Sequence, residues 1–406
     1  MWRHIASNAL TFFVVGLFLL AGGVSYAAKK YASAGPLPQA ICFQVERGAT
    51  MRQVSADLAD QGAVASAAMM RQVSADLADQ GAVASAAMMR IGADYAGKSD
   101  QLKAGSFLVP ETASMEQIVD IVTRGGQNTC GTEVVYRVGV TAGDVLVREL
   151  DPVTNRFTEV AKFDPALDEA PEAYSAIVDE PDTQFRVAVA EGVTSWQVVD
   201  VLSRIALLNV DTTDVPAEGA LAPDSYEITK GTTVSSILER MASAQSRVLA
   251  DAWANRADGL PIKTPQEALI LASLIEKETG VPEERGQVAS VFVNRLNLGM
   301  RLQTDPAVIY GITEGVGVLG RGLRQSELRR ETPWNTYVIP ALPPTPIANP
   351  GRASIEAALN PDSTEFIFFV ADGTGGHAFA VTLAEHNRNV EAWRRIEAER
   401  ENADGG

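Results

Sequence analysis

The sequence predicts an α+β protein built from an N-terminal transmembrane helix, a small α/β module and a larger mixed α/β domain. Three observations lead to this prediction. A predominantly apolar run covers residues 9–28, short helix-like and strand-like pieces follow up to about residue 185, and a long apolar helix pattern ends at Gly280. A chain of 406 residues is long enough for two or three domains.

The apolar run from Ala9 to Ala28 has about the length that spans a bilayer, and it is either a membrane anchor or a signal peptide. Ser25-Tyr26-Ala27 loosely fits a small-x-small cleavage site, which favours removal, whereas the length of the run favours retention. Basic residues flank the run on both sides, so charge does not settle its orientation. We expect a cytoplasmic stub and a single-pass anchor over residues 1–30, with the bulk of the chain outside the cytoplasm.

Charge and cysteine content exclude several classes of protein. A formal net charge of -17 argues against nucleic acid or anionic lipid as the main partner, because an acidic surface attracts neither. The two cysteines, Cys42 and Cys130, are too few for a zinc cluster or a disulfide-dense scaffold. In an oxidising compartment we expect them to pair with each other, which would bracket the small module.

A perfect tandem repeat lies inside the small module: residues 51–69 read the same as residues 70–88. Each copy holds a short helix pattern closed by a glycine, with a serine as a possible cap for the next helix. These residues are Val54, Leu58, Ala59, Gly62 and Ser66 in the first copy and Val73, Leu77, Ala78, Gly81 and Ser85 in the second. Solenoids need three or more units, so two identical copies indicate a recent duplication or a sequence artefact.

Residues 131–185 combine strand-like pieces with a run of acidic side chains. The apolar pieces Val134–Val138 and Val145–Val147 indicate strands, and the acidic residues between 164 and 182 indicate a solvated surface. We interpret this segment as an acidic, β-rich insertion or a linker.

The most informative segment is a helix that ends in two glutamates on either side of a lysine. Thr264, Pro265 and Glu267 form a capping box with proline in the first turn, and Gly280 stands where a C-terminal glycine cap is expected. At about 100° per residue, Glu278 falls on the stripe of large aliphatic residues and Glu276 points elsewhere. Burial would raise the pKa of Glu278 and let it hold a proton near neutral pH. The alternative is that both glutamates are exposed acids at a helix end.

Ordered motifs then connect this helix to a known family. The text from Glu276-Lys277-Glu278-Thr279-Gly280 through Val288–Leu296 and Gly299–Pro306 to Tyr310-Gly311 resembles the endolytic murein transglycosylases of the MltG (YceG-like) type. Later elements resemble the family in the same order: Asn335-Thr336-Tyr337, Leu342-Pro343-Pro344, Pro346–Gly351, Phe369-Val370-Ala371, Gly375–Phe379 and Glu385-His386-Asn387. The resemblance is close from Pro223 to Trp393. Two departures, Trp334 for a common tyrosine and Ala341 for a usual glycine, affect loop detail.

The resemblance implies a domain organisation. It places a YceG-like catalytic domain at 186–396 and, once one repeat copy is removed, a LysM-like module at 41–130. We expect residues 397–406 to form a disordered tail. The resemblance also favours retention of the N-terminal helix, which implies a cell inner membrane protein with its catalytic domain in the periplasm.

The resemblance implies a peptidoglycan lytic transglycosylase with Glu278 as its acid/base. In such a reaction one carboxyl protonates the glycosidic oxygen and then accepts the proton of the muramic acid 6-hydroxyl, which leaves a 1,6-anhydro end. A hydrolase would need two carboxyl groups, and no second one stands out in the sequence. The resemblance also implies proximity to glycan-polymerising synthases.

Polar and aromatic residues of the same motifs are candidate contacts to the glycan. They are Asn294, Gln303, Thr304, Asp305, Tyr310, Asn335, Tyr337, His377, Phe379 and Asn387, with Trp334 as a further stacking candidate. A metal site formed by His377, Glu385 and His386 matches no zinc helix motif, so we predict neither metal nor cofactor. The Pro-rich run from Leu342 to Pro350 is expected to form a stiff loop.

Two other functions stay open at this point. A membrane-bound glycan-binding scaffold would use the LysM-like module and would not depend on Glu278. A muramidase would share the fold and the acid but would release reducing ends.

Overall fold

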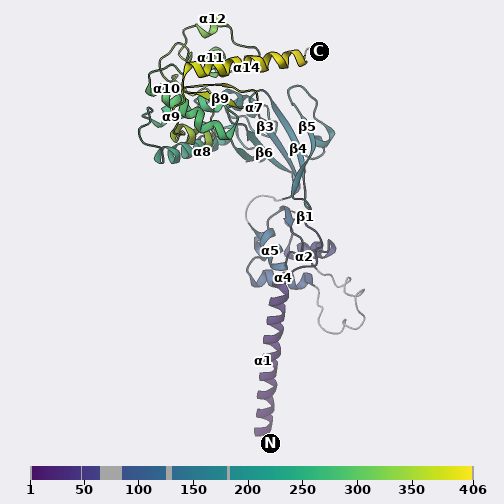
Figure 1. Cartoon of the computed structure of the whole chain (residues 1–406). Coiled ribbons are helices and arrows are strands. Elements are labelled where there is room, and N and C mark those ends of the chain that lie inside the picture. The colour runs from purple at the N-terminus through teal and green to yellow at the C-terminus, as the bar shows by residue number, and fades with distance from the viewer. Residues whose placement is uncertain (1, 47, 65–84, 125–129, 181–182, 405–406) are drawn as a thin grey trace. The chain divides into compact units, whose positions relative to one another are not determined.

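The computed structural model describes residues 2–46, 48–64, 85–124, 130–180 and 183–404 (Figure 1). The chain divides into two compact units. The first comprises Met1–Val134, Val147–Lys162 and Ala170–Gln184, and the second comprises Val135–Leu146, Phe163–Glu169 and Phe185–Gly406. Helices and strands alternate in both units, which agrees with the mixed α/β class expected from the sequence.

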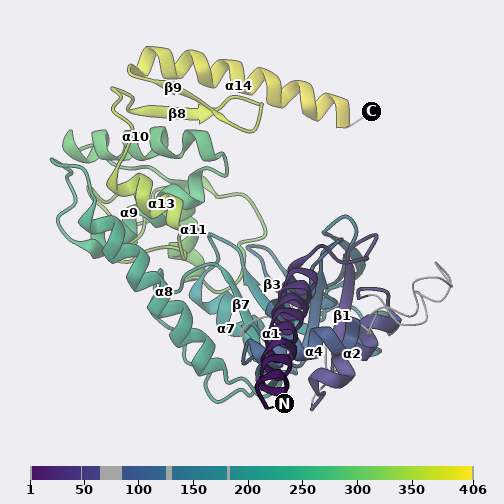
Figure 2. The same ribbon diagram turned by 90° about the horizontal axis from the view of Figure 1, so that it is seen from below.

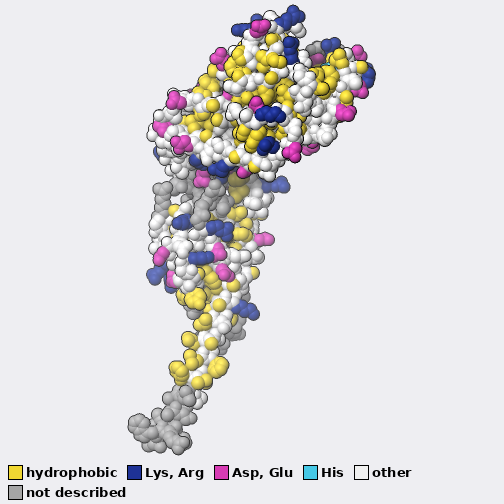
Figure 3. Space-filling model, turned by 90° about the vertical axis from the view of Figure 1, so that its left-hand side faces the viewer, with side chains coloured by type: hydrophobic (Ala, Val, Ile, Leu, Met, Phe, Trp, Pro, Cys, Tyr) yellow, Lys and Arg dark blue, Asp and Glu magenta, His cyan; other side chains and the backbone are white. Residues whose placement is uncertain are grey.

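Helix α1 (Trp2–Ala32) carries a long, mainly apolar stretch in its central part. Its large side chains face outward; Phe18, for example, is 76% exposed, and Figure 3 shows hydrophobic side chains along the exposed length of the helix. Within the described residues it is the one helix long and apolar enough to cross a membrane, over Phe13–Ala32. This window overlaps the expected run at 9–28, and a signal sequence would share the same properties.

The first unit pairs two antiparallel strands, β1 (Ile41–Val45) and β2 (Gly105–Val109), with Phe43 opposite Phe107. Helices α2 (Met51–Asp60) and α4 (Ser85–Tyr95) lie between them in sequence, followed by the 3-10 turn η1 (Ser99–Gln101). Helix α5 (Met115–Thr123) completes the unit. A single apolar core joins these elements, and its fully buried members include Phe43, Leu58, Met89 and Ile118.

The first repeat copy forms the predicted helix. Thr50 and Gln53 cap α2 reciprocally, Val54 and Leu58 are buried, and Gly62 has the positive φ of 76° expected at the end of the pattern. Ser85, predicted as a possible cap of the next helix, is instead the first residue of α4. The other pattern residues of the second copy, Val73, Leu77, Ala78 and Gly81, lie outside the described residues, as does Ser66.

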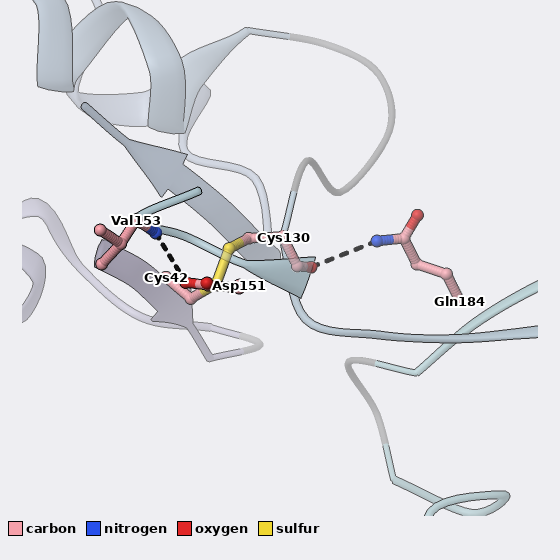
Figure 4. The surroundings of a disulfide bond; sticks show 5 residues. All are labelled: Cys42, Cys130, Asp151, Val153 and Gln184. Atoms are coloured by element: carbon pink, nitrogen blue, oxygen red, sulfur yellow. Dashed lines mark hydrogen bonds between the residues drawn. A yellow bond between two sulfur atoms is a disulfide. The ribbon is translucent and has the colours of Figure 1, made fainter. Parts of the chain in front are cut away.

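A disulfide joins Cys42 in β1 to Cys130, just before β3, as expected from the cysteine content (Figure 4). The two Cα atoms are 5.5 Å apart, and the bond closes a loop of 88 residues around the module. Gln184 Nε2 donates a hydrogen bond to the Cys130 carbonyl (3.2 Å), which holds the backbone of the second cysteine in place.

Removing this disulfide should destabilise the first unit. In the chain-entropy description, closing a loop of this length stabilises the folded state by about 4.6 kcal/mol. Thermal unfolding of a Cys42→Ala/Cys130→Ala variant should therefore show a lower melting temperature for the first unit, with the second unit unchanged. Non-reducing peptide mapping of the exported protein that finds both thiols free would contradict the pairing.

The segment expected as an insertion or linker is a set of strands in a larger sheet. Strands β3 (Thr132–Val138), β4 (Gly143–Asp151) and β5 (Arg156–Phe163) join β6 (Gln184–Val189) and β7 (Ser225–Ile228) in the order β5-β4-β3-β6-β7. Strands β6 and β7 are antiparallel, with Val187 opposite Tyr226. The short helix α6 (Glu172–Ser175) precedes β6. The linker alternative is therefore wrong, because residues 133–136 of β3 are all buried and β4 buries the alternating residues Val145 and Val147.

The second unit is centred on one apolar helix, α9 (Pro265–Glu278), which packs against α8, α10, α11 and α13 (Figure 2). The bounds of these helices are α7 Ser195–Arg204, α8 Val234–Ala254, α10 Arg285–Asn297, α11 Asp305–Thr313, α12 Gln325–Leu328 and α13 Arg352–Leu359, with the 3-10 turn η2 at Pro282–Glu284. Leu271, Leu274, Phe292 and Ile355 are fully buried in the shared core.

The chain ends with an antiparallel hairpin, β8 (Phe368–Ala371) and β9 (His377–Ala380), and a long helix, α14 (Leu383–Asp404). Figure 2 shows α14 lying along this hairpin. The prediction of a disordered tail from residue 397 is wrong as far as Asp404, because the helix continues to that residue. Arg400 stabilises the continuation: its guanidinium donates to the Gly373 carbonyl and lies over the Trp393 ring.

Candidate active site at the end of helix α9

Helix α9 begins as predicted and ends differently. Glu267 N–H donates to Thr264 Oγ1 and Thr264 N–H donates to Glu267 Oε2, both at 3.2 Å, which completes the capping box. The helix ends at Glu278, and the cap residue Thr279 is extended with φ of −137°. The expectation that Gly280 caps the helix is wrong, because Gly280 does not have the positive φ of a glycine cap and the chain is already extended at Thr279. Its Oγ1 accepts the N–H of Val281 (3.0 Å).

Glu278 is the desolvated carboxyl of the pair. Burial, reinforced by the negative charge of Asp305, raises its pKa to about 8, and the opposing effect of the Arg295 guanidinium is smaller. Part of its surface stays accessible. In the described part of the chain, no hydrogen-bond donor within the protein is assigned to its carboxyl group, whereas Glu276 Oε2 accepts the N–H of Gly351 (3.0 Å). Glu278 is therefore protonated at neutral pH and available to a ligand.

Asp305 and Tyr337 form a hydrogen-bonded pair, and the charge of Asp305 acts on Glu278. Tyr337 Oη donates to Asp305 Oδ1 (2.7 Å), and Asp305 is the first residue of α11. Burial and this hydrogen bond raise the pKa of Tyr337, as does the charge of Glu278. Both residues were predicted as glycan contacts, and both retain accessible surface. They supply a carboxylate and a phenol beside the acid.

Arg295 is the cation of this cluster, and the sequence analysis did not select it. It is buried, and its Nε and Nη1 donate to the carbonyls of Ile367 and Leu302, each at 2.7 Å. Burial lowers its pKa, and the charges of Tyr337 and Glu278 raise it. The sequence did contain a sign of this role, because Arg295 is the one charged residue in the otherwise mainly apolar segment Val288–Leu296. A buried arginine needs hydrogen-bond acceptors and a charge partner.

The backbone before α11 is strained next to this cluster. Gln303 has a φ of 53°, which non-glycine residues rarely adopt, and its N–H donates to the Thr336 carbonyl (3.1 Å). Thr304 N–H donates to Thr336 Oγ1 (2.9 Å) and Thr336 Oγ1 donates to the Thr304 carbonyl (3.1 Å). These hydrogen bonds between two loop segments fix the start of α11, and thus the position of Asp305. The Gln303 side chain itself is exposed.

Three of the residues predicted to contact glycan use their side chains in hydrogen bonds to the protein's own backbone. Asn335 is 0% exposed, and its Nδ2 donates to the carbonyls of Glu327, Leu328 and Arg330. Thr304 is 2% exposed and caps α11. Asn294 Nδ2 donates to the carbonyls of Thr364 and Phe366, each at 2.9 Å. The prediction that Asn335 and Thr304 contact glycan is therefore wrong, because both side chains are buried; they organise loops, and Asn294 is used in the same way.

Tyr310 and Trp334 belong to a separate aromatic contact. Their ring centroids are 5.6 Å apart, and Trp334 Nε1 donates to Thr345 Oγ1 (2.9 Å). Burial and the adjacent Glu218 carboxyl raise the pKa of Tyr310. Burial also raises the pKa of Glu218, although Ser195 N–H donates to its Oε1 (2.8 Å). The Tyr310 and Trp334 rings therefore pack against protein groups and do not form an open stacking surface.

The remaining predicted residues lie on the C-terminal hairpin and helix. Glu284 Oε2 lies 2.8 Å from His377 Nδ1, and its Oε1 accepts the His377 N–H (2.8 Å). Phe379 is half-buried and stacks on Phe366 at 5.4 Å. Asn387 is exposed on α14. Glu284 thus holds the hairpin to η2, a link that the sequence pattern did not reveal.

No group of three or more His, Cys, Asp or Glu side chains suited to a metal ion occurs among the described residues. What the α9 end offers instead is proton chemistry: a carboxyl that is protonated near neutral pH, a carboxylate bonded to a phenol, and a buried guanidinium.

Comparisons with known proteins identify relatives of this chain. The chain is 36% identical over 179 residues to an endolytic murein transglycosylase of Bacillus subtilis strain 168, covering 44% of this chain and 48% of that protein. It is 29% identical over 308 residues to an endolytic murein transglycosylase of Streptococcus pneumoniae strain D39, covering 73% of this chain and 52% of that protein. The chain thus spans about half the length of these curated relatives.

A solved structure of a putative YceG-like protein from Listeria monocytogenes is 22% identical, with a TM-score of 0.42, over 86% of this chain and 98% of that one. The model of the YceG-like family matches residues 43–392, which cover most of both units and include Glu278, Arg295, Asp305 and Tyr337. The chain therefore belongs to the YceG-like family.

Proposed function

We propose that the protein is an endolytic peptidoglycan lytic transglycosylase that cuts the bond between N-acetylmuramic acid and N-acetylglucosamine in nascent glycan strands. The observation that carries the proposal is the carboxyl of Glu278, which is protonated near neutral pH, partly accessible and unused by other described residues. Membership of the YceG-like family and the names of the curated relatives support the same reaction class.

The reaction needs one proton carrier. Glu278 gives its proton to the glycosidic oxygen as the bond from that oxygen to C1 of the muramic acid breaks. The muramic acid 6-hydroxyl oxygen bonds to C1, and its proton passes to the Glu278 carboxylate, which restores the acid. The substrate's N-acetyl group stabilises the cation-like carbon during the exchange. Water is not consumed, and the product is a 1,6-anhydro end.

Asp305 and Tyr337 are proposed to support this step. The Asp305 charge helps to keep Glu278 protonated, and Tyr337 fixes the Asp305 carboxylate through its hydroxyl. Both retain accessible surface next to the acid, so they are the strongest candidates for sugar contacts. Gln303, His377, Phe379 and Asn387 stay candidates for more distant contacts.

A muramidase is the second candidate, and Asp305 favours it. Hydrolysis of a glycoside uses two carboxyl groups, and Asp305 is a second carboxylate whose charge acts on Glu278. Its hydrogen bond to Tyr337 limits its freedom to act as a base. The glycan-binding scaffold without catalysis is not favoured, because it gives no reason for a protonated, accessible glutamate.

Product analysis separates the two reactions. Purified glycan strands digested with the protein should yield 1,6-anhydromuramic ends from internal cuts, identified by mass spectrometry. Each anhydro end is 18 mass units lighter than the corresponding reducing end, which is the mass of one water. Reducing ends in comparable yield would assign the protein to the muramidases instead.

The placement of the protein in the cell is part of the proposal. We infer that α1 is a retained anchor in the cell inner membrane and that the catalytic domain at 186–396 lies in the periplasm. The β1-α2-α4-β2 order of the first unit supports a LysM-like, glycan-binding module. In that position the enzyme would act close to the glycan-polymerising synthases and limit the length of their product.

A further inference from the structure

The last turn of α9 holds two side chains that the proposed reaction does not use. Glu276 Oε2 accepts the N–H of Gly351 (3.0 Å), and Lys277 Nζ donates to the Gly192 carbonyl (3.2 Å). Helix ends fray because their last carbonyls lack partners within the helix. Glu278 is the final residue of α9, so its carboxyl can stay in one place only if the turn is held from outside.

The backbone that receives these two side chains is buried at both Gly192 and Gly351. A Cβ on Gly351 would come within 1.7 Å of Glu191 Oε1, so a larger residue there would displace the Glu191 side chain. Asn349 joins the two receiving segments: its carbonyl accepts the N–H of Gly192 (2.9 Å), and its Nδ2 donates to the Val193 carbonyl (3.1 Å). Asn349 is 0% exposed. Glu276 and Lys277 are therefore tied to one buried unit.

A third hydrogen bond extends this contact along the same face of α9. Ile347 N–H donates to Ser273 Oγ (3.0 Å), and Ser273 lies one turn before Glu276. The segment from Ile347 to Gly351 is thus bonded to α9 at two points three residues apart on the helix. This explains the Pro-rich motif: its prolines stiffen a buried strap beside the helix that carries the acid.

The charges around Glu276 are separate from those around Glu278. Burial and the charge of Glu276 raise the pKa of Glu191, which Arg285 lowers. Burial lowers the pKa of Lys277, and the charge of Glu276 opposes this. The charged groups that act on Glu278, Asp305 and Arg295, do not contribute to the pKa shifts of Glu191 and Lys277. A change at Glu276 therefore removes no charge that acts directly on the acid.

We propose that Glu276 and Lys277 are positioning residues that clamp the last turn of α9 to the backbone at Gly351 and Gly192. The clamp holds the Glu278 carboxyl in its desolvated position. This inference rests on the proposed function of Glu278, and it assigns a role to all three residues of the Glu-Lys-Glu motif.

The test compares two variants that differ in one hydrogen bond. Glu276→Gln keeps an oxygen that can accept the Gly351 N–H, whereas Glu276→Ala does not. Lys277→Met removes the donor and keeps the apolar stem. Glu283→Ala, at an exposed position in η2, is the matched control. The full-length chain in detergent is assayed on purified glycan strands for kcat, KM and the pH dependence of kcat, and hydrogen exchange is measured over residues 274–279.

Glu276→Ala and Lys277→Met should lower kcat about tenfold with KM changed by less than about twofold, because a displaced acid loses reactivity rather than substrate affinity. The alkaline limb of their kcat profiles should move by about one pH unit towards acid. Water would reach a loosened Glu278 and lower the pKa that burial had raised. Hydrogen exchange at the end of α9 should become faster. Glu276→Gln should restore the limb and stay within about threefold of the wild-type kcat.

Three results would overturn the clamp. The first is a Glu276→Ala protein with an unmoved alkaline limb and wild-type exchange at residues 274–279. The second is a loss of activity that only follows the unfolded fraction. The third is a Glu276→Gln protein as impaired as Glu276→Ala. Should Glu278→Gln prove active, the proposed function fails by itself, and the exchange rates still decide whether the clamp exists.

Discussion

Glu278→Gln is expected to remove nearly all glycan cleavage while the protein stays folded. Glutamine has the shape of the carboxyl but cannot donate a proton and recover it, and the loss of an acid/base typically costs about 100-fold or more in kcat. Release of soluble fragments from purified glycan measures this directly. Because Glu278 has no assigned donor within the described residues, the amide breaks no hydrogen bond that the fold needs.

The matched control is Glu276→Gln, two residues earlier on the same helix. Its amide oxygen can still accept the Gly351 N–H, so its activity should fall far less than that of Glu278→Gln. Equal losses in the two variants, or a dead Glu276→Gln beside an active Glu278→Gln, would show that the acid is assigned to the wrong glutamate.

Stability gives an independent check that inactive Glu278→Gln is folded. The folded-state pKa of Glu278, about 8, lies above its ordinary value of 4.5, so the fold favours the protonated form. Its contribution to stability is fully present below pH 4.5 and is lost as the pH rises through about 8. Glutamine does not ionise and loses nothing over this range. At pH 8 to 9 the variant should melt no lower than the wild type.

The start and orientation of α9 could be predicted from sequence because both follow from local chemistry. Thr264 and Glu267 cap each other within one turn, and a helical period of 3.6 residues places Glu278 on the apolar stripe. The end of the helix could not be predicted in the same way. Gly280 stands at the usual position of a glycine cap, but it does not have a positive φ, and the helix ends with an extended Thr279 whose Oγ1 accepts the N–H of Val281.

The candidate contacts show where residue type alone fails. Asn335 and Asn294 carry amides that suit sugar hydroxyls, yet both amides bond to backbone carbonyls, and those of Asn294 lie some 70 residues further along the chain. Arg295 was hidden for the opposite reason, because it lies in an apolar helix and contacts its acceptors only after folding. Asp305 was chosen by motif, but its partner Tyr337 and its effect on Glu278 depend on tertiary contacts.

The strands between 132 and 163 illustrate a similar limit in the fold. Their alternation predicts strands, but the place of β3 beside β6 in a five-stranded sheet depends on pairing between distant segments. The acidic residues after β5 had suggested a linker. In the structure they lie in the connection from β5 to β6, two strands of the same sheet. Local pattern thus gave the elements, and long-range pairing decided their association.

The pH dependence of catalysis should have an alkaline limb near pH 8 that Asp305 helps to set. Burial is the main reason that the pKa of Glu278 is raised to about 8, and the Asp305 charge adds to it against the opposing Arg295. The acid works when protonated, so kcat should be high below this pH and fall tenfold per unit above it.

Asp305→Asn removes the negative charge and keeps an oxygen that can accept the Tyr337 hydroxyl. The protonated form of Glu278 then loses one source of stabilisation, so the alkaline limb should move towards acid while the limb of the control Glu314→Gln stays in place. Glu314 is exposed at the end of the same helix, and its charge does not contribute to the raised pKa of Glu278. Profiles of kcat between pH 5 and 10 measure the alkaline limb of each variant.

An unmoved limb in Asp305→Asn with unchanged activity would show that Asp305 does not act on the acid. Complete loss of activity, with hydrolytic products in the wild type, would make Asp305 the second carboxyl of a muramidase, because a hydrolase needs both groups and a transglycosylase needs one.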